Sequence, residues 1–321
     1  MTRRTRTPRR PVDRTALHDL ISASPELRGS TKKQYLADLD KYLAFVGTDP
    51  KAWTRANTSK FYAHLLGEEE MLPQSANRVM ASVQYASKWF ASRANDGTLE
   101  FAEIQLAHGR DRAGREALTD EDLIALLSTC HFKRPRDLRD FAMMVLTIET
   151  GARRASVIGS TWESIQAQPY LSMLMALKGI DAPFAVPLSD TARQALGPWE
   201  AWLKRKQEPR RGHIFRKLVK VEGGARLGEP LTPAAFYEMT RARSKVAGLA
   251  PVHPHLFRHT FITGRLAAGF TPFQIAAITG HRLPGNWGGN LYTYSDKKVL
   301  GEQIRNSTPA WLTSYVRKFC G

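Results

Sequence analysis

Apolar side chains recur at helical spacing along the N-terminal third of the chain. Residues 31–34 fit a capping box, and four apolar positions follow three or four residues apart: Tyr35, Leu39, Tyr42 and Leu43. This spacing predicts an amphipathic helix of roughly four turns that begins at the box. The segments 57–66 and 73–93 repeat the period. We therefore expect residues 16–94 to form an all-helical domain.

The pattern changes after residue 117. A second capping box at residues 119–122 precedes Leu123, Leu126 and Leu127, and an apolar run over residues 141–147 ends near Gly151. These features predict two further helices. The stretches 170–177 and 183–188 flank a turn at residues 178–181, which predicts a short β-hairpin. The fold class is therefore mainly α with a small β-sheet (α+β).

The segments that lack an apolar period set the domain boundaries. Residues 1–14 contain six arginines and one acid, a composition with too little apolar surface to fold alone. Residues 95–116 are similarly polar and charged. We predict a flexible basic arm over residues 1–15, a helical domain over 16–94, a linker over 95–116 and a second domain over 117–321. A length of 321 residues suits two domains.

Net charge indicates the kind of partner. Lys and Arg number 47 against 30 Asp and Glu, a formal charge of +17, which favours nucleic acid or an anionic membrane surface. Residues 201–220 alone carry a net +7 with Trp202 and Phe215 interleaved, and we favour phosphate contact there over a merely solvated face. No apolar run approaches 18 residues, so we expect no membrane span.

Targeting and redox features are sparse. The arginine-rich start has no apolar segment behind it, so we expect no secretory signal and a location inside the cell. The two cysteines, Cys130 and Cys320, are too few for a disulfide framework or a four-ligand zinc site, and we expect both to be reduced.

A histidine-rich stretch at residues 253–259 lies where carboxylates are absent. From Met239 to Ser295 there is no Asp or Glu in 57 residues. Mg²⁺ needs carboxylate oxygens, so a two-metal nuclease site is disfavoured, and zinc held by histidines alone remains a weak alternative. His255 and Arg258 are three residues apart at a predicted helix start, within reach of one phosphate. The stretch predicts metal-free phosphoryl transfer.

Five sequence blocks in this order resemble the tyrosine recombinase, or phage integrase, family. The similarity spans about residues 117–297, and residues 29–93 more loosely resemble the core-binding domain of the family. The matching blocks are Thr150-Gly151-Ala152-Arg153 with Trp162-Glu163, Leu177-Lys178-Gly179 with Val186-Pro187-Leu188, Pro254-His255-Leu256-Phe257-Arg258-His259-Thr260, Thr279-Gly280-His281, and Leu291-Tyr292-Thr293.

The resemblance implies a catalytic role for one side chain or two in each block. It implies that Tyr292 is the nucleophile and Lys178 the general acid for the departing 5′-hydroxyl. The chemistry of the remaining side chains suits a phosphate site: two arginines can clamp the non-bridging phosphate oxygens, and histidines can shuttle a proton or donate a hydrogen bond. The implied catalytic set is Arg153, Lys178, His255, Arg258, His281 and Tyr292, with no metal and no cofactor.

Two departures from the family pattern bear on this set. The family usually has Glu or Asp three residues after the first arginine, whereas this chain has Ser156. The support for Arg153 must therefore come from elsewhere. The glycine-rich stretch from His281 to Tyr292 is a couple of residues longer than usual, which leaves Tyr294 as an alternative nucleophile; we favour Tyr292 because it begins the family's Tyr-Thr pair.

The resemblance also implies a quaternary arrangement. The two domains of the family form a C-shaped clamp on double-stranded DNA, and four protomers exchange strands through a Holliday junction. An apolar stripe follows Thr308, a predicted helix cap, and Pro309: Trp311, Leu312, Tyr315, Val316 and Phe319. We weigh docking of this stripe on its own domain equally with docking on a neighbouring protomer. We expect a cytoplasmic, nucleoid-associated enzyme, or one acting in a host cell if phage-encoded.

Three functions are weighed. The blocks favour a site-specific recombinase, most plausibly the integrase of a phage or other mobile element, working through a 3′-phosphotyrosyl intermediate. A type IB topoisomerase would share the chemistry but relax DNA without forming a junction. A non-catalytic, architectural DNA-binding protein would retain the basic surface without turnover. RNA binding has little support, because no aromatic RNP-type motif is present.

Overall fold

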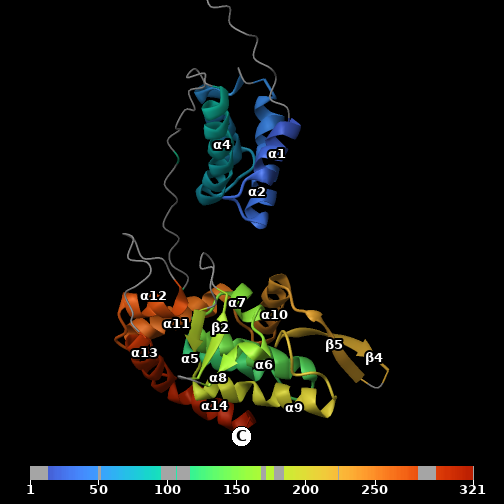
Figure 1. The fold of residues 1–321 in the computed structure, drawn as a ribbon, viewed down its shortest axis with the longest axis vertical. Helices are drawn as coiled ribbons and strands as arrows, with labels where there is room; N and C mark the ends of the chain where they lie inside the picture. The colour runs from blue at the N-terminus through green and yellow to red at the C-terminus, as the bar shows by residue number, and fades with distance from the viewer. Residues whose placement is uncertain are drawn as a thin grey trace, which may run out of the picture. The chain divides into compact units, whose positions relative to one another are not determined.

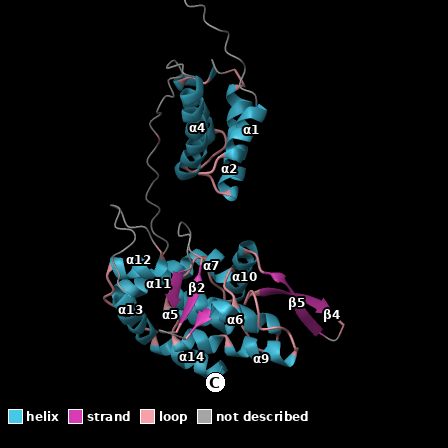
Figure 2. Ribbon diagram, in the orientation of Figure 1, coloured by secondary structure: helices cyan, strands magenta, loops and turns pink. Residues whose placement is uncertain are grey.

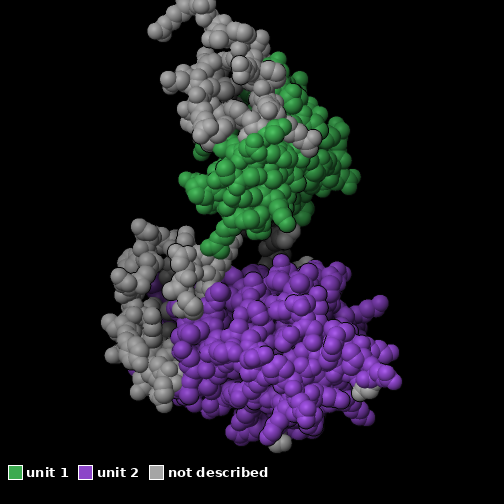
Figure 3. All heavy atoms as spheres, turned by 45° about the vertical axis from the view of Figure 1, so that its right-hand side comes forward, with its two compact units in different colours: residues 1–114 green, residues 115–321 purple. Residues whose placement is uncertain are grey.

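The computed structural model describes residues 14–49, 52–94, 106, 116–167, 171–176, 184–222, 224–280 and 294–320. The chain divides into two compact units, Met1–Gly114 and Arg115–Gly321, coloured separately in Figure 3. Nearly all of the predicted basic arm and linker lies outside the described residues. Within the described ranges, no helix is long and apolar enough to cross a membrane.

Unit 1 is helical throughout its described part, as the apolar spacing predicts. It consists of α1 (Arg14–Ala23), α2 (Gly29–Val46), α3 (Arg55–Gly67) and α4 (Pro73–Ala94), drawn from blue to teal in Figure 1. Its core is built from the apolar faces of these helices, with Leu39, Tyr42, Phe61, Leu65 and Val79 fully or almost fully buried. The aromatic rings of Tyr42 and Phe61 meet edge to face at 5.1 Å.

The start of α2 corrects the sequence interpretation. The helix begins at Gly29, not at a Thr31 capping box, and Arg28 is the N-cap residue without a side-chain cap. The Lys32 amide already donates to the Arg28 carbonyl at 2.9 Å. Gln34 does not reach back to a cap, because its amide donates to Asp38 at 3.1 Å. Gln34 thus serves a buried carboxylate instead of the helix end.

Asp38 joins two helices of unit 1. Its side chain is only 3% exposed and accepts hydrogen bonds from Arg78 (2.6 Å) and Ser82 (2.8 Å) of α4. A buried carboxylate is tolerated only when such donors replace its water. The cluster therefore fixes how α2 packs on α4.

Unit 2 surrounds α6 with helices and carries two small sheets (Figure 2). A single turn of 3₁₀ helix at Trp162–Ser164 precedes the first strand. The other elements are α5 (Asp120–Ser128), α6 (Pro135–Thr150), α7 (Arg154–Ile158), β1 (Ile165–Gln166), β2 (Ser172–Met175), β3 (Phe184–Pro187), α8 (Asp190–Ala195), α9 (Gly197–Arg205), β4 (Arg216–Val221), β5 (Gly224–Pro230), α10 (Pro233–Val246), α11 (Pro254–Ala267), α12 (Pro272–Thr279), α13 (Tyr294–Asn306) and α14 (Ala310–Cys320).

The two helices predicted at the start of this unit are present. Thr119 and Asp122 form the expected capping box of α5, and Leu123, Leu126 and Leu127 are buried. α6 is buried from Asp137 to Thr150 and ends where Gly151 adopts a left-handed conformation, with φ +57°. Its two buried aspartates are neutralised across the core by Arg243 of α10, at 2.6 Å from Asp137 and 2.8 Å from Asp140.

The predicted hairpin is confirmed in its strands. β2 and β3 pair antiparallel, with Met173 opposite Val186, and β1 extends the sheet in the order β1-β2-β3. The sequence analysis missed β1 and the separate β4–β5 ribbon. β1 has only two residues, and the three apolar residues of β4 do not alternate with its three basic ones, so neither strand gave a periodic apolar signal.

The basic stretch 201–220 covers the end of α9 and most of β4. Its interleaved aromatic side chains lie inside the protein: Trp202 is 6% exposed and Phe215 is fully buried. They belong to the core and cannot stack on nucleic-acid bases. The basic side chains of this stretch remain a predicted phosphate-contacting surface.

The apolar stripe of α14 packs on its own unit. Leu312 and Val316 are fully buried in the core of unit 2, and Phe319 stacks on Phe132 with ring centroids 5.1 Å apart. α14 begins at Ala310, so Pro309 and not Thr308 directly precedes the helix. The Thr308 hydroxyl donates to the buried carboxylate of Glu149 at 2.5 Å. The contacts in the described residues are therefore those expected when the stripe docks on its own domain.

Gly151 gives a stability prediction for unit 2. A Cβ at this position would overlap the Phe261 ring and force an L residue to keep a positive φ, whereas a Cβ at Gly269 (φ +86°) would have nothing within 4 Å. We expect Gly151→Ala to lower the free energy of unfolding by about 2–4 kcal/mol and the control Gly269→Ala by about 1–2 kcal/mol. Urea denaturation of the full chain measures both; equal losses would contradict a role for Phe261.

Candidate active site

Arg153 is positioned by the end of α6. The left-handed Gly151 turns the chain out of α6 so that Arg153 becomes the N-cap residue of α7. The side chain of Phe261 fills the space beside Gly151. Glycine is required at this turn both for its φ and for the lack of a side chain.

α11 carries two of the predicted site residues. It begins at Pro254, as the sequence predicts, so His255 and Arg258 lie one turn apart. Arg258 is only 1% exposed, and its guanidinium donates to the carbonyls of Gly151 (2.7 Å) and Thr279 (2.9 Å). The Arg258 side chain thereby links α11 to the C-terminal ends of α6 and α12.

The end of α12 takes the place of the missing carboxylate. Arg153 donates through Nη1 to the carbonyls of Thr279 (3.3 Å) and Gly280 (3.4 Å). Thr279 thus accepts from both arginines, at a helix C-terminus where carbonyl dipoles favour cations. Gly280 ends α12 in a left-handed conformation, and Thr271 caps its start with Gln274.

Ser156, which stands where the family has an acid, contacts the sheet instead of Arg153. Its hydroxyl donates to the carbonyl of Ala176 at 2.5 Å, next to the end of β2. The serine therefore ties α7 to the strand that leads toward the predicted lysine turn. Its role is structural attachment, and Arg153 takes its support from α12.

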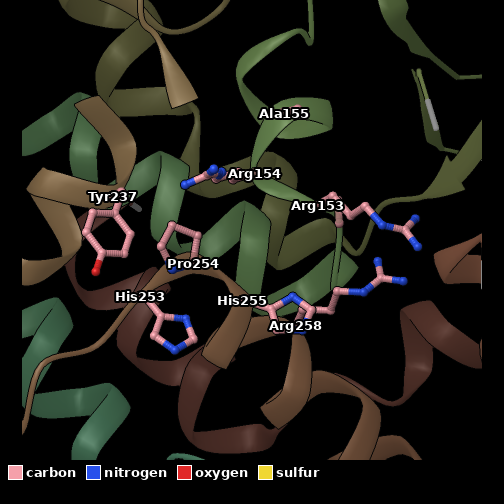
Figure 4. Close-up of a pocket in the computed structure, with 9 residues that line it drawn as sticks. Arg153, Arg154, Ala155, Tyr237, His253, Pro254, His255 and Arg258 are labelled. Atoms are coloured by element: carbon pink, nitrogen blue, oxygen red, sulfur yellow. The ribbon is translucent and has the colours of Figure 1, made fainter. Parts of the chain in front are cut away.

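Arg153, His255 and Arg258 line one cavity of about 310 Å³. Figure 4 shows the guanidinium groups of Arg153 and Arg258 next to each other, with His255 beside them. None of the lining residues is acidic: they are Ala152, Arg153, Arg154, Ala155, Tyr237, His253, Pro254, His255 and Arg258. An anion entering the cavity would therefore meet hydrogen-bond donors without competing carboxylates.

Burial and the positive charge of neighbouring side chains together lower the pKa of Arg258 and of His255. Burial, and then the charge of Arg153, lowers the pKa of Arg258 to about 10, so it stays protonated at neutral pH. Partial desolvation lowers the pKa of His255 below its ordinary value, and the nearby Arg258, Arg153 and His259 lower it further. His255 is therefore neutral at pH 7 and able to accept a proton.

Three predicted catalytic residues lie outside the described residues: Lys178, His281 and Tyr292. Their assignments remain predictions. In the sequence, His281 directly follows Gly280, whose carbonyl lies 3.4 Å from Arg153. The alternative nucleophile, Tyr294, is the first residue of α13. The structure brings together Arg153, His255 and Arg258.

Sequence reasoning missed part of the cavity. Arg154, Tyr237 and His253 also line it. Arg154 belongs to none of the recognised blocks, and His253 is in the sequence only the first residue of the histidine-rich stretch. Tyr237 lies on α10, far from every recognised block, so no motif pointed to it. Their shared position comes from the packing of α7, α10 and α11.

Comparison with known proteins agrees with this geometry. The phage integrase family profile matches residues 116–298. A tyrosine recombinase, XerD of Listeria monocytogenes serovar 1/2a, is 26% identical over 301 residues, which cover 91% of this chain and 97% of that protein.

Two solved structures share the fold. XerH recombinase in a post-cleavage complex with a palindromic difH substrate has a TM-score of 0.64 at 16% identity, covering 91% of this chain and 84% of that one. A lambda integrase tetramer bound to a Holliday junction has a TM-score of 0.62 at 17% identity, covering 86% and 78%. Because the family profile matches more than half of the sequence, this chain belongs to the phage integrase family and is a tyrosine-type site-specific recombinase.

Proposed function

We propose that this recombinase cleaves double-stranded DNA by attack of the Tyr292 oxygen on a backbone phosphorus. The P–O5′ bond breaks, a 3′-phosphotyrosyl bond forms, and the strand leaves with a 5′-hydroxyl. The observation that carries the proposal is the pair of adjacent guanidinium groups, Arg153 and Arg258, in a cavity without an acidic lining residue. This arrangement suits a phosphate that gains negative charge as it reacts.

Each proposed role follows from side-chain chemistry. Arg153 and Arg258 bind the two non-bridging oxygens and stay charged throughout. A phenol with an ordinary pKa of about 10 is almost entirely protonated at neutral pH, so Tyr292 needs a base, and the neutral His255 can take its proton. Lys178 protonates the departing 5′-oxygen, and His281 donates a hydrogen bond to the phosphate.

Strand exchange follows from the covalent intermediate. The phosphotyrosyl bond conserves the energy of the phosphodiester, so the 5′-hydroxyl of a second strand can attack it and release Tyr292 without ATP or a metal ion. Four copies of the chain on two duplexes would perform this in two rounds through a Holliday junction. The lambda integrase neighbour, a tetramer on such a junction, supports this assembly.

Charge supports DNA as the substrate. A net +17 over 321 residues favours a polyanion, and the XerH neighbour is bound to its DNA substrate. The helical unit 1 and the catalytic unit 2 would grip the duplex as a C-shaped clamp. A cytoplasmic, nucleoid-associated enzyme of a phage or another mobile element fits this proposal.

Replacing the proposed nucleophile gives the most direct test. We expect Tyr292→Phe to retain DNA binding but lose the covalent complex on a nicked cognate site by at least about 10³-fold, because phenylalanine has no attacking oxygen. The wild-type adduct, trapped and mapped by mass spectrometry, should lie on Tyr292.

The matched control is Tyr294→Phe, which should form the adduct at the wild-type rate. An adduct mapped to Tyr294 would move the nucleophile. Relaxation of supercoiled DNA by the wild type without any junction intermediate would instead favour a topoisomerase.

The pKa of His255 predicts the pH dependence of cleavage. A base must be unprotonated, so the single-turnover rate should rise with pH through a midpoint below about pH 6.5, the ordinary imidazole value, and then reach a plateau. His255→Gln should lower the plateau about 10²- to 10⁴-fold and remove the acidic limb. An acidic limb with its midpoint above about pH 6.5, or one that persists in the variant, would contradict this role; binding by Tyr292→Phe at each pH is the control.

Because there is no acidic residue from Met239 to Ser295, we predict that DNA cleavage does not require a divalent metal ion. We expect single-turnover cleavage of a nicked half-site to proceed at an unchanged rate in excess EDTA, because the arginines supply the positive charge that Mg²⁺ would otherwise provide. A half-site makes the assay independent of synapsis. A loss of cleavage that Mg²⁺ restores would contradict metal-free chemistry.

A further inference from the structure

The cavity continues beyond the proposed scissile-phosphate site. Arg153, His255 and Arg258 occupy one end, and Figure 4 shows Arg154, Tyr237 and His253 at the other. The second group comes from three elements: the first residue of α7, the middle of α10 and the N-cap position of α11. None of the three belongs to the proposed catalytic set.

All three side chains carry hydrogen-bond donors, and all three line the cavity. A guanidinium, a phenol and an imidazole together offer the donors that a phosphate diester accepts. Arg154 is exposed, and no residue in the described ranges forms an ion pair or hydrogen bond with it. Among the described residues, the Tyr237 hydroxyl likewise has no hydrogen-bond partner, although the guanidinium of Arg241 lies 5.9 Å from its ring.

The spacing of His253 and His255, one residue from each end of the cavity, is comparable to that of neighbouring phosphates. The rings of His253 and His255 are nearly parallel, 17° apart in plane, with centroids at 6.4 Å. Successive phosphates of one DNA strand rise by about 3.4 Å along the helix axis, and their rotation about that axis makes the direct separation larger. One strand could therefore place one phosphate at each end.

Electrostatics favours the same ligand. Arg154 adds a third guanidinium to a cavity that already holds Arg153 and Arg258 and no carboxylate. The repulsion from Arg153, which adds to burial in lowering the pKa of Arg258, is relieved when anions enter. A second phosphate would neutralise the end of the cavity that the scissile phosphate cannot reach.

We propose that Arg154, Tyr237 and His253 form a second phosphate subsite, which holds the phosphate adjacent to the scissile one on the same strand. This inference rests on the proposed function for the identity of the first phosphate. A contact one nucleotide away fixes the register of the strand, so that the scissile phosphorus lies in line with the nucleophile. Arg154, Tyr237 and His253 are therefore positioning residues for cleavage.

The test is a methylphosphonate scan of bound DNA. The probe is a duplex half-site selected from a randomised library by the full-length chain, synthesised with one neutral methylphosphonate at each backbone position in turn. Binding is measured by fluorescence anisotropy in the Tyr292→Phe background, so that no covalent complex forms. A phosphate that pairs with an arginine loses that pairing when its charge is removed.

We expect the parent protein to bind about ten- to a hundredfold more weakly when either of two successive phosphates is neutralised. Adding Arg154→Ala should abolish the sensitivity at one of them, and adding Arg153→Ala should abolish it at the other. Tyr237→Phe should weaken binding several-fold and reduce the effect only at the Arg154 position. The charge-matched control Arg317→Ala, at an exposed position of α14, should leave the scan unchanged.

The outcomes separate the subsite from the proposed function. The subsite is overturned if Arg154→Ala leaves every methylphosphonate effect intact, if the affected phosphate is not adjacent to that of Arg153, or if the variant changes the selected base sequence. Thermal unfolding of each variant shows whether a loss reflects misfolding. If adjacency holds but the wild type forms no phosphotyrosyl adduct, the subsite stands and the proposed cleavage fails.

Discussion

The carbonyl of Thr279 is the contact on which the site depends. It accepts from Arg258 at 2.9 Å and from Arg153 at 3.3 Å, so two like charges are held side by side by one helix end. Without an acceptor between them, the guanidiniums would repel each other and move toward solvent. The C-terminal carbonyls of α12 offset part of that repulsion and leave a positive charge excess for a phosphate.

This arrangement differs chemically from support by a carboxylate. A carboxylate beside Arg153 would neutralise one of the two guanidiniums, whereas a carbonyl orients the side chain and leaves its charge in place. Burial lowers the pKa of Arg258, and the charge that remains on Arg153 lowers it further. The chain can therefore carry Ser156, which is bonded to Ala176, without losing the orientation of the arginines.

The scaffold behind the site explains why such a charged cluster is tolerated. α6 runs through the core and ends at Gly151, whose carbonyl accepts from Arg258 at 2.7 Å. At its other end α6 holds Asp137 and Asp140, both paired with Arg243. These contacts at both ends fix the direction of α6, and they hold the Gly151 carbonyl in place as an acceptor for Arg258.

The sequence by itself determined the helical character of both units, the α5 cap, the hairpin strands and the family. Each of these depends on the identity of side chains: on their apolar period, on capping residues or on ordered sequence blocks. Tertiary structure decided what supports Arg153 and which further residues share its cavity. Every residue has a backbone carbonyl, so the sequence does not show which one accepts a hydrogen bond from Arg153. The acceptor, Thr279, lies 126 residues further along the chain. Tyr237 reaches the cavity only through the packing of α10 against α7 and α11, and side-chain identity alone does not encode that proximity.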